Sequence, residues 1–138
     1  MPQDNPAKMK SPLDSTTTYD SILSTLWYDK DGILCSVFKN VPRTLDRCID
    51  RTTLIKSITK DKAVCCIMEV SNSGTMDKEA SDHIKNEIPT MYKALAIVTT
   101  TPVGQMVAAS TTVLVPSTIP TKTFSDSKQA SLWLQQYL

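Results

Sequence analysis

Apolar and polar positions change their spacing from segment to segment along this chain, and each spacing predicts a strand or a helix. Two apolar, β-prone runs, 22–28 and 33–38, flank the Asp31-Gly32 pair. An Asp-Gly pair between such runs is typical of a hairpin, so we expect the chain to open with two antiparallel strands. Residues 63–68 and 95–98 are continuous apolar runs, which is the pattern of strands buried on both faces.

The segments between these strands repeat their apolar residues every three or four positions, as one face of a helix does. This spacing predicts helices over 43–59, 77–88 and 103–115. In the first helix we expect Arg43 to lie in water, and we expect Thr75 and Thr101 to cap the other two. The residues expected to face the core in the third helix are Val103, Met106, Val107 and Ser110.

The last segment predicts a short strand at 121–124 and a closing helix capped by Ser125. The order β-β-α-β-α-β-α-β-α indicates an α/β fold, with an N-terminal antiparallel hairpin and an otherwise parallel sheet covered by helices. The runs 63–68 and 95–98 should lie side by side and parallel. Residues 1–18 are rich in Pro, Asp, Lys, Ser and Thr, so we expect a flexible N-terminal tail and a single domain over 19–138.

Composition argues against several functions. The chain of 138 residues has 15 basic and 14 acidic residues and a net charge of +1, so no nucleic-acid or membrane partner is indicated. It has no apolar run of about 20 residues that could span a membrane, and its first ten residues lack a secretory apolar region, so we expect a cytoplasmic protein. Neither a dinucleotide nor a P-loop glycine motif occurs, and we expect no cofactor.

The residues that could bind metal or act as nucleophiles are few. Cys35, Cys48, Cys65 and Cys66 have no C-x-x-C spacing, so we expect buried free thiols. The only histidine, His83, lies four residues from both Glu79 and Glu87, which would place three metal-ligand types on one helix face. The polar surroundings favour a solvated face instead, and we predict no metal site. Without a G-x-S-x-G motif we also predict no enzymatic activity.

From about Tyr19 to Leu138 the chain resembles the SpoIIAA-like (STAS) fold. More narrowly, it is similar to the small bacterial proteins described as STAS/SEC14 domain-containing, many of them from Bacteroidetes. The most specific segments are 94–98 (ALAIV) and 124–134 (FSDSKQASLWL), and Trp27 and the Asp31-Gly32 turn also fit. The resemblance implies a fold and no catalytic motif.

In the anti-anti-sigma branch of this fold, a phosphorylatable serine lies in an Asp-Ser-Ser-Gly stretch that opens the helix after the central strand. The corresponding stretch here is 76–80 (MDKEA). Asp77 matches the acidic residue, but Lys78 and Glu79 stand where the serines would be. The comparison predicts that this chain lacks the phosphoserine switch.

The loops that follow the two apolar strands form the expected ligand site. In a parallel sheet the carboxyl ends of the strands line a crevice, and both loops lead into helix N-termini, which favour anions. The candidate ligand-binding residues are Ser71, Asn72, Ser73, Thr100 and Thr101. Ordinary helix capping needs the same residue types, so both interpretations remain open.

The stretch from Val103 to Val115 contains no charged residue. It could pack against a second subunit, line a cavity for an apolar ligand, or lie within its own core. We therefore expect a non-enzymatic interaction or regulatory module, homodimeric and with an unidentified protein partner. The alternative is a small-molecule carrier that binds an anionic or lipid-like ligand at the carboxyl ends of the strands or beside Val103–Val115.

Overall fold

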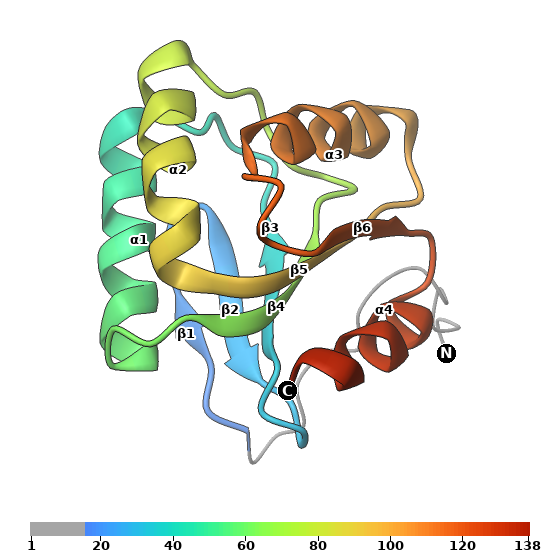
Figure 1. Cartoon of the computed structure of the whole chain (residues 1–138). Coiled ribbons are helices and arrows are strands. Elements are labelled where there is room, and N and C mark those ends of the chain that lie inside the picture. Colours follow the sequence, from blue (N-terminus) through green and yellow to red (C-terminus); the bar gives the residue numbers. More distant parts are fainter. Residues whose placement is uncertain (1–15) are drawn as a thin grey trace.

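The structure is a computed structural model that describes residues 16–138, and these residues form a six-stranded sheet (Figure 1). The strands lie in the order of the sequence. They are β1 (Tyr19–Asp20), β2 (Ser24–Tyr28), β3 (Leu34–Phe38), β4 (Val64–Glu69), β5 (Tyr92–Val98) and β6 (Thr121–Phe124). β1, β2 and β3 pair antiparallel, and β3 through β6 pair parallel. This arrangement confirms the predicted hairpin and parallel sheet.

Helices cover both faces of this sheet. They are α1 (Leu45–Thr59), α2 (Lys78–Met91), α3 (Pro102–Leu114) and α4 (Ser127–Leu134), and a 3-10 turn, η1 (Gln135–Tyr137), follows α4. Figure 1 shows α1 and α2 together on one side of the sheet, α4 on the opposite side, and α3 across one end. One apolar core joins the sheet to α1, α2 and α3, and a second joins it to α4.

The continuous apolar runs form the middle of the sheet because their side chains must be buried on both faces. In β4, Cys65 and Ile67 enter the α4 core, whereas Cys66 and Met68 enter the larger core. β4 lies parallel to β5, with Cys66 opposite Leu95. The predicted pairing of the two runs is therefore confirmed.

The hairpin turn is held by its own side chains. The Asp29 carboxylate accepts hydrogen bonds from the backbone N–H groups of Asp31 and Ile33, at 2.9 and 3.0 Å. Gly32 has a φ of 81°, a conformation that a residue without Cβ adopts at little cost. The turn residues thus set the register in which Trp27 lies opposite Cys35.

Several predicted boundaries and caps were wrong. β1 was not predicted, since a two-residue edge strand has no periodicity of its own. α2 is capped by Asp77, whose carboxylate accepts from the Ala80 N–H at 2.9 Å, and not by Thr75. α4 is capped by Asp126 and not by Ser125. In each case the carboxylate immediately before the helix forms the capping bond, which satisfies a free N–H group. Residues 1–15, most of the expected tail, lie outside the described residues.

Candidate functional site

A cavity of about 30 Å³ lies between the sheet and the helices α1, α2 and α3. Its walls are mainly apolar, with three methionines among them: Met68, Met76 and Met91. A space of that size holds about two water molecules. Two cationic side chains, Arg43 and Arg51, also line it. The cavity therefore combines apolar walls with two positive charges.

Arg51 is buried because it lies on the inward stripe of α1. The buried residues of this helix are Cys48, Arg51, Thr52, Ile55 and Thr59. Arg51 is 7% exposed, and its guanidinium donates to Ser24 Oγ and Ser36 Oγ at 2.8 Å each and to the Tyr92 hydroxyl at 3.4 Å. All three acceptors are neutral oxygen atoms. They come from β2, β3 and β5, so one side chain links the helix to three strands.

Arg43 approaches the same cavity from the loop before α1. It is 6% exposed, and its Nε donates to the Gly74 carbonyl at 3.1 Å. Burial lowers the pKa of Arg43 from its usual value, and the neighbouring positive charge of Arg51 lowers it further. Both guanidinium carbons lie near the Phe38 ring, 6.0 Å from its centroid for Arg43 and 4.4 Å for Arg51. The aromatic face thus attracts both cations.

Neither arginine has an acidic partner within residues 16–138. The ion pairs in this part of the chain join Lys39 to Asp20, Lys56 to Glu87 and Lys78 to Asp82. A buried cation without an anion is costly, because the low-dielectric interior replaces water around it. The prediction that Arg43 lies in water was wrong, because the loop 71–75 covers it and accepts its hydrogen bonds.

The loops at the carboxyl ends of β4 and β5 meet as the sequence predicted, and most of their hydroxyl groups bond to each other. Ser71 Oγ accepts from the Thr100 N–H at 3.0 Å, and Thr101 Oγ donates to the Ser71 carbonyl at 2.7 Å. Thr101 Oγ also accepts from the Gly104 N–H at 2.9 Å, which caps α3. These bonds join the two loops and use the same atoms that would have met a ligand.

Two of the five candidate ligand-binding residues have side chains without a hydrogen-bond partner among the described residues. Asn72 is exposed, and no hydrogen bond of its side chain occurs among residues 16–138. Ser73 is buried, and its hydroxyl has no hydrogen-bond partner in that part of the chain. Thr100 is exposed beside Ser71. The structure therefore brings the candidate residues together at one edge of the sheet.

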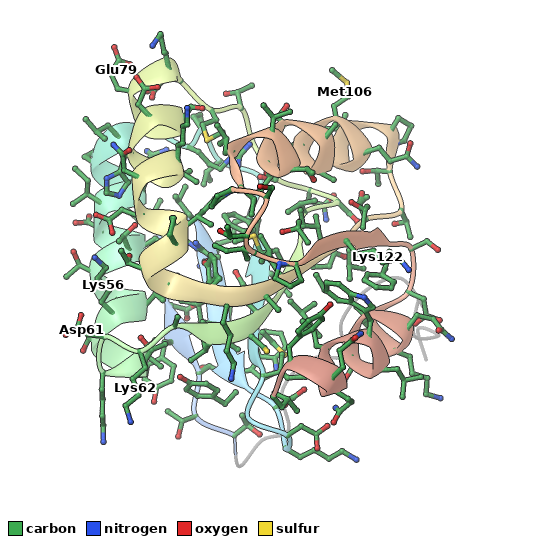
Figure 2. The ribbon with its side chains drawn as sticks, in the orientation of Figure 1. Lys56, Asp61, Lys62, Glu79, Met106 and Lys122 are labelled. Carbon is green, nitrogen blue, oxygen red and sulfur yellow. The ribbon has the colours of Figure 1, made fainter. Side chains whose placement is uncertain are left out.

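The three metal-ligand types on α2 separate into different contacts. His83 Nε2 lies 3.0 Å from Thr52 Oγ on α1, and Glu87 forms a 2.7 Å ion pair with Lys56, also on α1. Glu79 is exposed at the far end of the helix (Figure 2). Among the described residues, no group of three or more His, Cys, Asp or Glu side chains could hold a metal ion. His83 and Glu87 instead help to pack α2 against α1.

The thiols are buried and free, as the sequence predicted. Burial raises the pKa of Cys66 to about 12 and raises that of Cys35 further. Burial also raises the pKa values of Cys48 and Cys65. With raised pKa values these side chains remain protonated at neutral pH. Because only the thiolate is a good nucleophile, they act as small apolar groups.

The outer face of α3 carries exposed apolar side chains. Val103, Met106 and Val113 are 58%, 71% and 82% exposed, and Figure 2 shows Met106 pointing away from the rest of the molecule. The buried residues of this helix are instead the small Gly104, Val107, Ala108 and Thr111. The prediction that Val103, Met106 and Ser110 face the core was therefore wrong, because close packing of α3 on the two loops requires small residues there.

Comparison with known proteins places this architecture in a fold class. Among solved structures the chain is similar to an uncharacterised protein of the DUF3478 family from Shewanella loihica PV-4, which has a SpoIIAA-like fold. The TM-score is 0.58 at 18% sequence identity, and the match covers 92% of this chain and 99% of the other. At that identity the likeness concerns the fold, and it confirms the predicted SpoIIAA-like fold.

The family follows from the sequence profile that the chain matches. Residues 26–138 match the Domain of unknown function (DUF7793), so the chain belongs to that family. None of the curated proteins matches the chain. No helix among residues 16–138 is both long enough and apolar enough to cross a membrane.

Sequence reasoning missed Arg51 as a site residue, although the sequence contains a signal. Arg51 lies three residues after Cys48 and four before Ile55, on the stripe that the spacing predicts to face the core. Two serines, Ser24 and Ser36, also interrupt the apolar strands β2 and β3. A cation on an inward stripe and polar residues in inward strand positions together indicate a buried polar cluster.

Proposed function

We propose that this chain is a non-enzymatic interaction module of the cytoplasm, and that the outer face of α3 binds a second copy of the chain. The observation that carries the proposal is the exposure of Met106 and Val113, at 71% and 82%. Large apolar side chains that remain in water on one helix face favour association, because burying them is favourable by about 25 cal/mol per Å². Protein contacts are then the means by which the module acts.

The chemistry of this face favours a second copy as its partner. No charged residue occurs between Lys93 and Lys122, so a partner with charged groups would lose hydration without gaining ion pairs. A second α3 offers an uncharged apolar face to match it. A two-fold axis would place the same residues on both sides of the interface, and the net charge of +1 gives little repulsion between copies.

Light scattering during size-exclusion chromatography tests this dimer. At high micromolar concentration, the molar mass measured for the wild-type peak should be twice that of one chain. Met106→Glu should elute as a monomer, since it places a carboxylate in the apolar interface. Leu132→Glu is the matched control, because Leu132 is 63% exposed on α4, across the sheet from α3. A monomeric wild type, or a Met106→Glu dimer, would contradict the proposed interface.

The predicted absence of a phosphoserine switch fits the start of α2. The Asp77 carboxylate already accepts from the Ala80 N–H, so an acidic group occupies the helix N-terminus without phosphorylation.

A second candidate function is a small-molecule carrier with a site at the carboxyl ends of β4 and β5. The buried hydroxyl of Ser73, which has no partner among the described residues, favours it, as does the exposed amide of Asn72. Native mass spectrometry of the chain purified from its source should then show an added mass. Asn72→Ala should lose that mass while keeping the elution volume. A wild-type spectrum at the bare chain mass would contradict the carrier function.

A further inference from the structure

We infer that the cavity between α1, α2 and α3 is a binding site for the carboxylate group of a small apolar acid, with Arg43 and Arg51 as its recognition residues. This inference goes beyond the proposed dimer and concerns different residues. It starts from the charge of the cavity. Two cations line one small apolar space, and no ion pair of residues 16–138 includes either of them.

Hydrogen bonding within the fold does not explain why these side chains are arginines. A guanidinium has five N–H donors, and for Arg43 only Nε has a protein acceptor among the described residues. Arg51 meets only hydroxyl groups, which neutral donors could satisfy equally well. Two buried like charges also repel each other. An anion between them would remove both costs, and the guanidinium fork matches the two oxygens of a carboxylate.

The size and walls of the cavity indicate the rest of the ligand. A volume of about 30 Å³ is enough for a group the size of about two water molecules, which suits a carboxylate better than a phosphate. The adjoining wall consists of apolar side chains, including Met68, Met91 and Ile88. The carboxylate would fill this void, so an apolar chain attached to it would have to displace some of these side chains.

Access to the cavity would lie at its partly buried wall residues, which come from the loop before α2, from α2 and from α3. Met76, Ile84 and Leu114 line the cavity and are only partly buried, so they separate it from solvent. The methionines can change rotamer and enlarge the space, because their side chains are unbranched and flexible. The inner face of α3 contributes Thr111 and Leu114 to the cavity wall.

Octanoate is a suitable probe of this site. At a concentration tenfold above its dissociation constant it should raise the Tm of the wild-type chain by about 4 °C. The same concentration of 1-octanol, which has the chain without the charge, and of acetate, which has the charge without the chain, should each raise it by less than about 1 °C. An equal rise with 1-octanol, or a rise with octyl phosphate but none with octanoate, would overturn the inference.

Variants of the two arginines identify the recognition residues. Arg51→Met and Arg43→Met should each weaken octanoate binding at least about tenfold in calorimetry, since each removes charge-assisted hydrogen bonds. Arg47→Met is the matched control, because Arg47 lies one turn before Arg51 on α1, donates to the Pro42 carbonyl and does not line the cavity. Unchanged octanoate affinity in both cavity variants would overturn the assignment.

Methyl NMR of the wild-type chain tests the location without any substitution. With ¹³C-methyl methionine, octanoate should shift the signals of Met68, Met76 and Met91, which line the cavity. The Met106 signal should not move with octanoate at constant protein concentration. Of these four signals, dilution should move only that of Met106 if the dimer forms, so failure of the dimer and failure of the cavity site are distinguishable. Octanoate that leaves the three cavity methyl signals unmoved would overturn the inference.

Discussion

At the scale of single residues, the protein places ionisable groups where water cannot reach them. Arg51, Tyr92 and Cys66 lie in one buried region of the larger core, and Tyr92 accepts a hydrogen bond from Arg51. Burial is the main cause that raises the pKa of Tyr92 to about 12 and that of Cys66 to about 12. The folded chain therefore keeps both protons at pH values where the unfolded chain has lost them.

These pKa values predict how stability depends on pH. The ordinary values are 9.0 for a thiol and 10.0 for a phenol, so the unfolded chain binds fewer protons than the folded one above about pH 9. The free energy of unfolding should be constant from pH 7 to pH 9 and should fall as the pH rises from 9 to 12. Urea unfolding at a series of pH values measures this. Cys66→Ala is a useful comparison, since it should make the fall shallower.

At the scale of elements, α3 differs from the other helices in how it packs. Gly104 lies where α3 approaches the two loops, and a Cβ there would meet the Thr99 hydroxyl and lie 2.9 Å from the Ser71 Cα. This close approach places the inner side of α3 on small residues. The larger Val103 and Met106 then point outward by geometry. Their exposure therefore follows from the way α3 packs on the two loops.

Gly104→Ala tests this packing. In an exposed helix interior, replacing Gly by Ala stabilises by about 1 kcal/mol. Here the added methyl group would push against the backbone of Ser71, so we expect a loss of about 1–3 kcal/mol in the free energy of unfolding. Gln105→Ala, at an exposed position of the same helix, should change it by less than about 0.5 kcal/mol. Chemical denaturation measures both, and a stabilised Gly104→Ala would show that α3 does not approach the loop closely.

At the scale of the whole molecule, one sheet separates two cores of different character. The core under α4 is small and apolar, with Ile33, Ala94 and Leu134 fully buried. The larger core contains the cavity and both buried arginines. The candidate functions therefore all lie on the α1–α3 side or at the carboxyl edge of the strands. We expect α4 to stabilise the sheet and to take no part in binding.

The same helix contributes to two of the proposed surfaces. The outer face of α3 carries Met106 and Val113, and its inner face brings Thr111 to the cavity wall. The two proposed sites therefore use different faces of α3, and octanoate and dilution test them separately.

The sequence by itself determined the order of strands and helices, the hairpin and the parallel pairing of β4 with β5. These follow from local signals, namely the Asp31-Gly32 turn and the apolar runs. Because the apolar runs must be buried on both faces, they have to lie in the middle of the sheet. It also determined that the thiols are buried. The loops carrying Ser71 and Thr101 were expected at one edge because parallel strands end together.

Only the tertiary structure decided which polar groups meet and which apolar groups remain in water. Arg43 is buried because the loop 71–75, distant in sequence, covers it, and Met106 is exposed because α3 packs through Gly104 and Ala108. The spacing of residues along a helix shows which side chains share a face. It does not show whether that face meets solvent or another segment of the chain. That environment depends on segments brought together by the whole fold, so the cavity lined by two arginines was visible only in three dimensions.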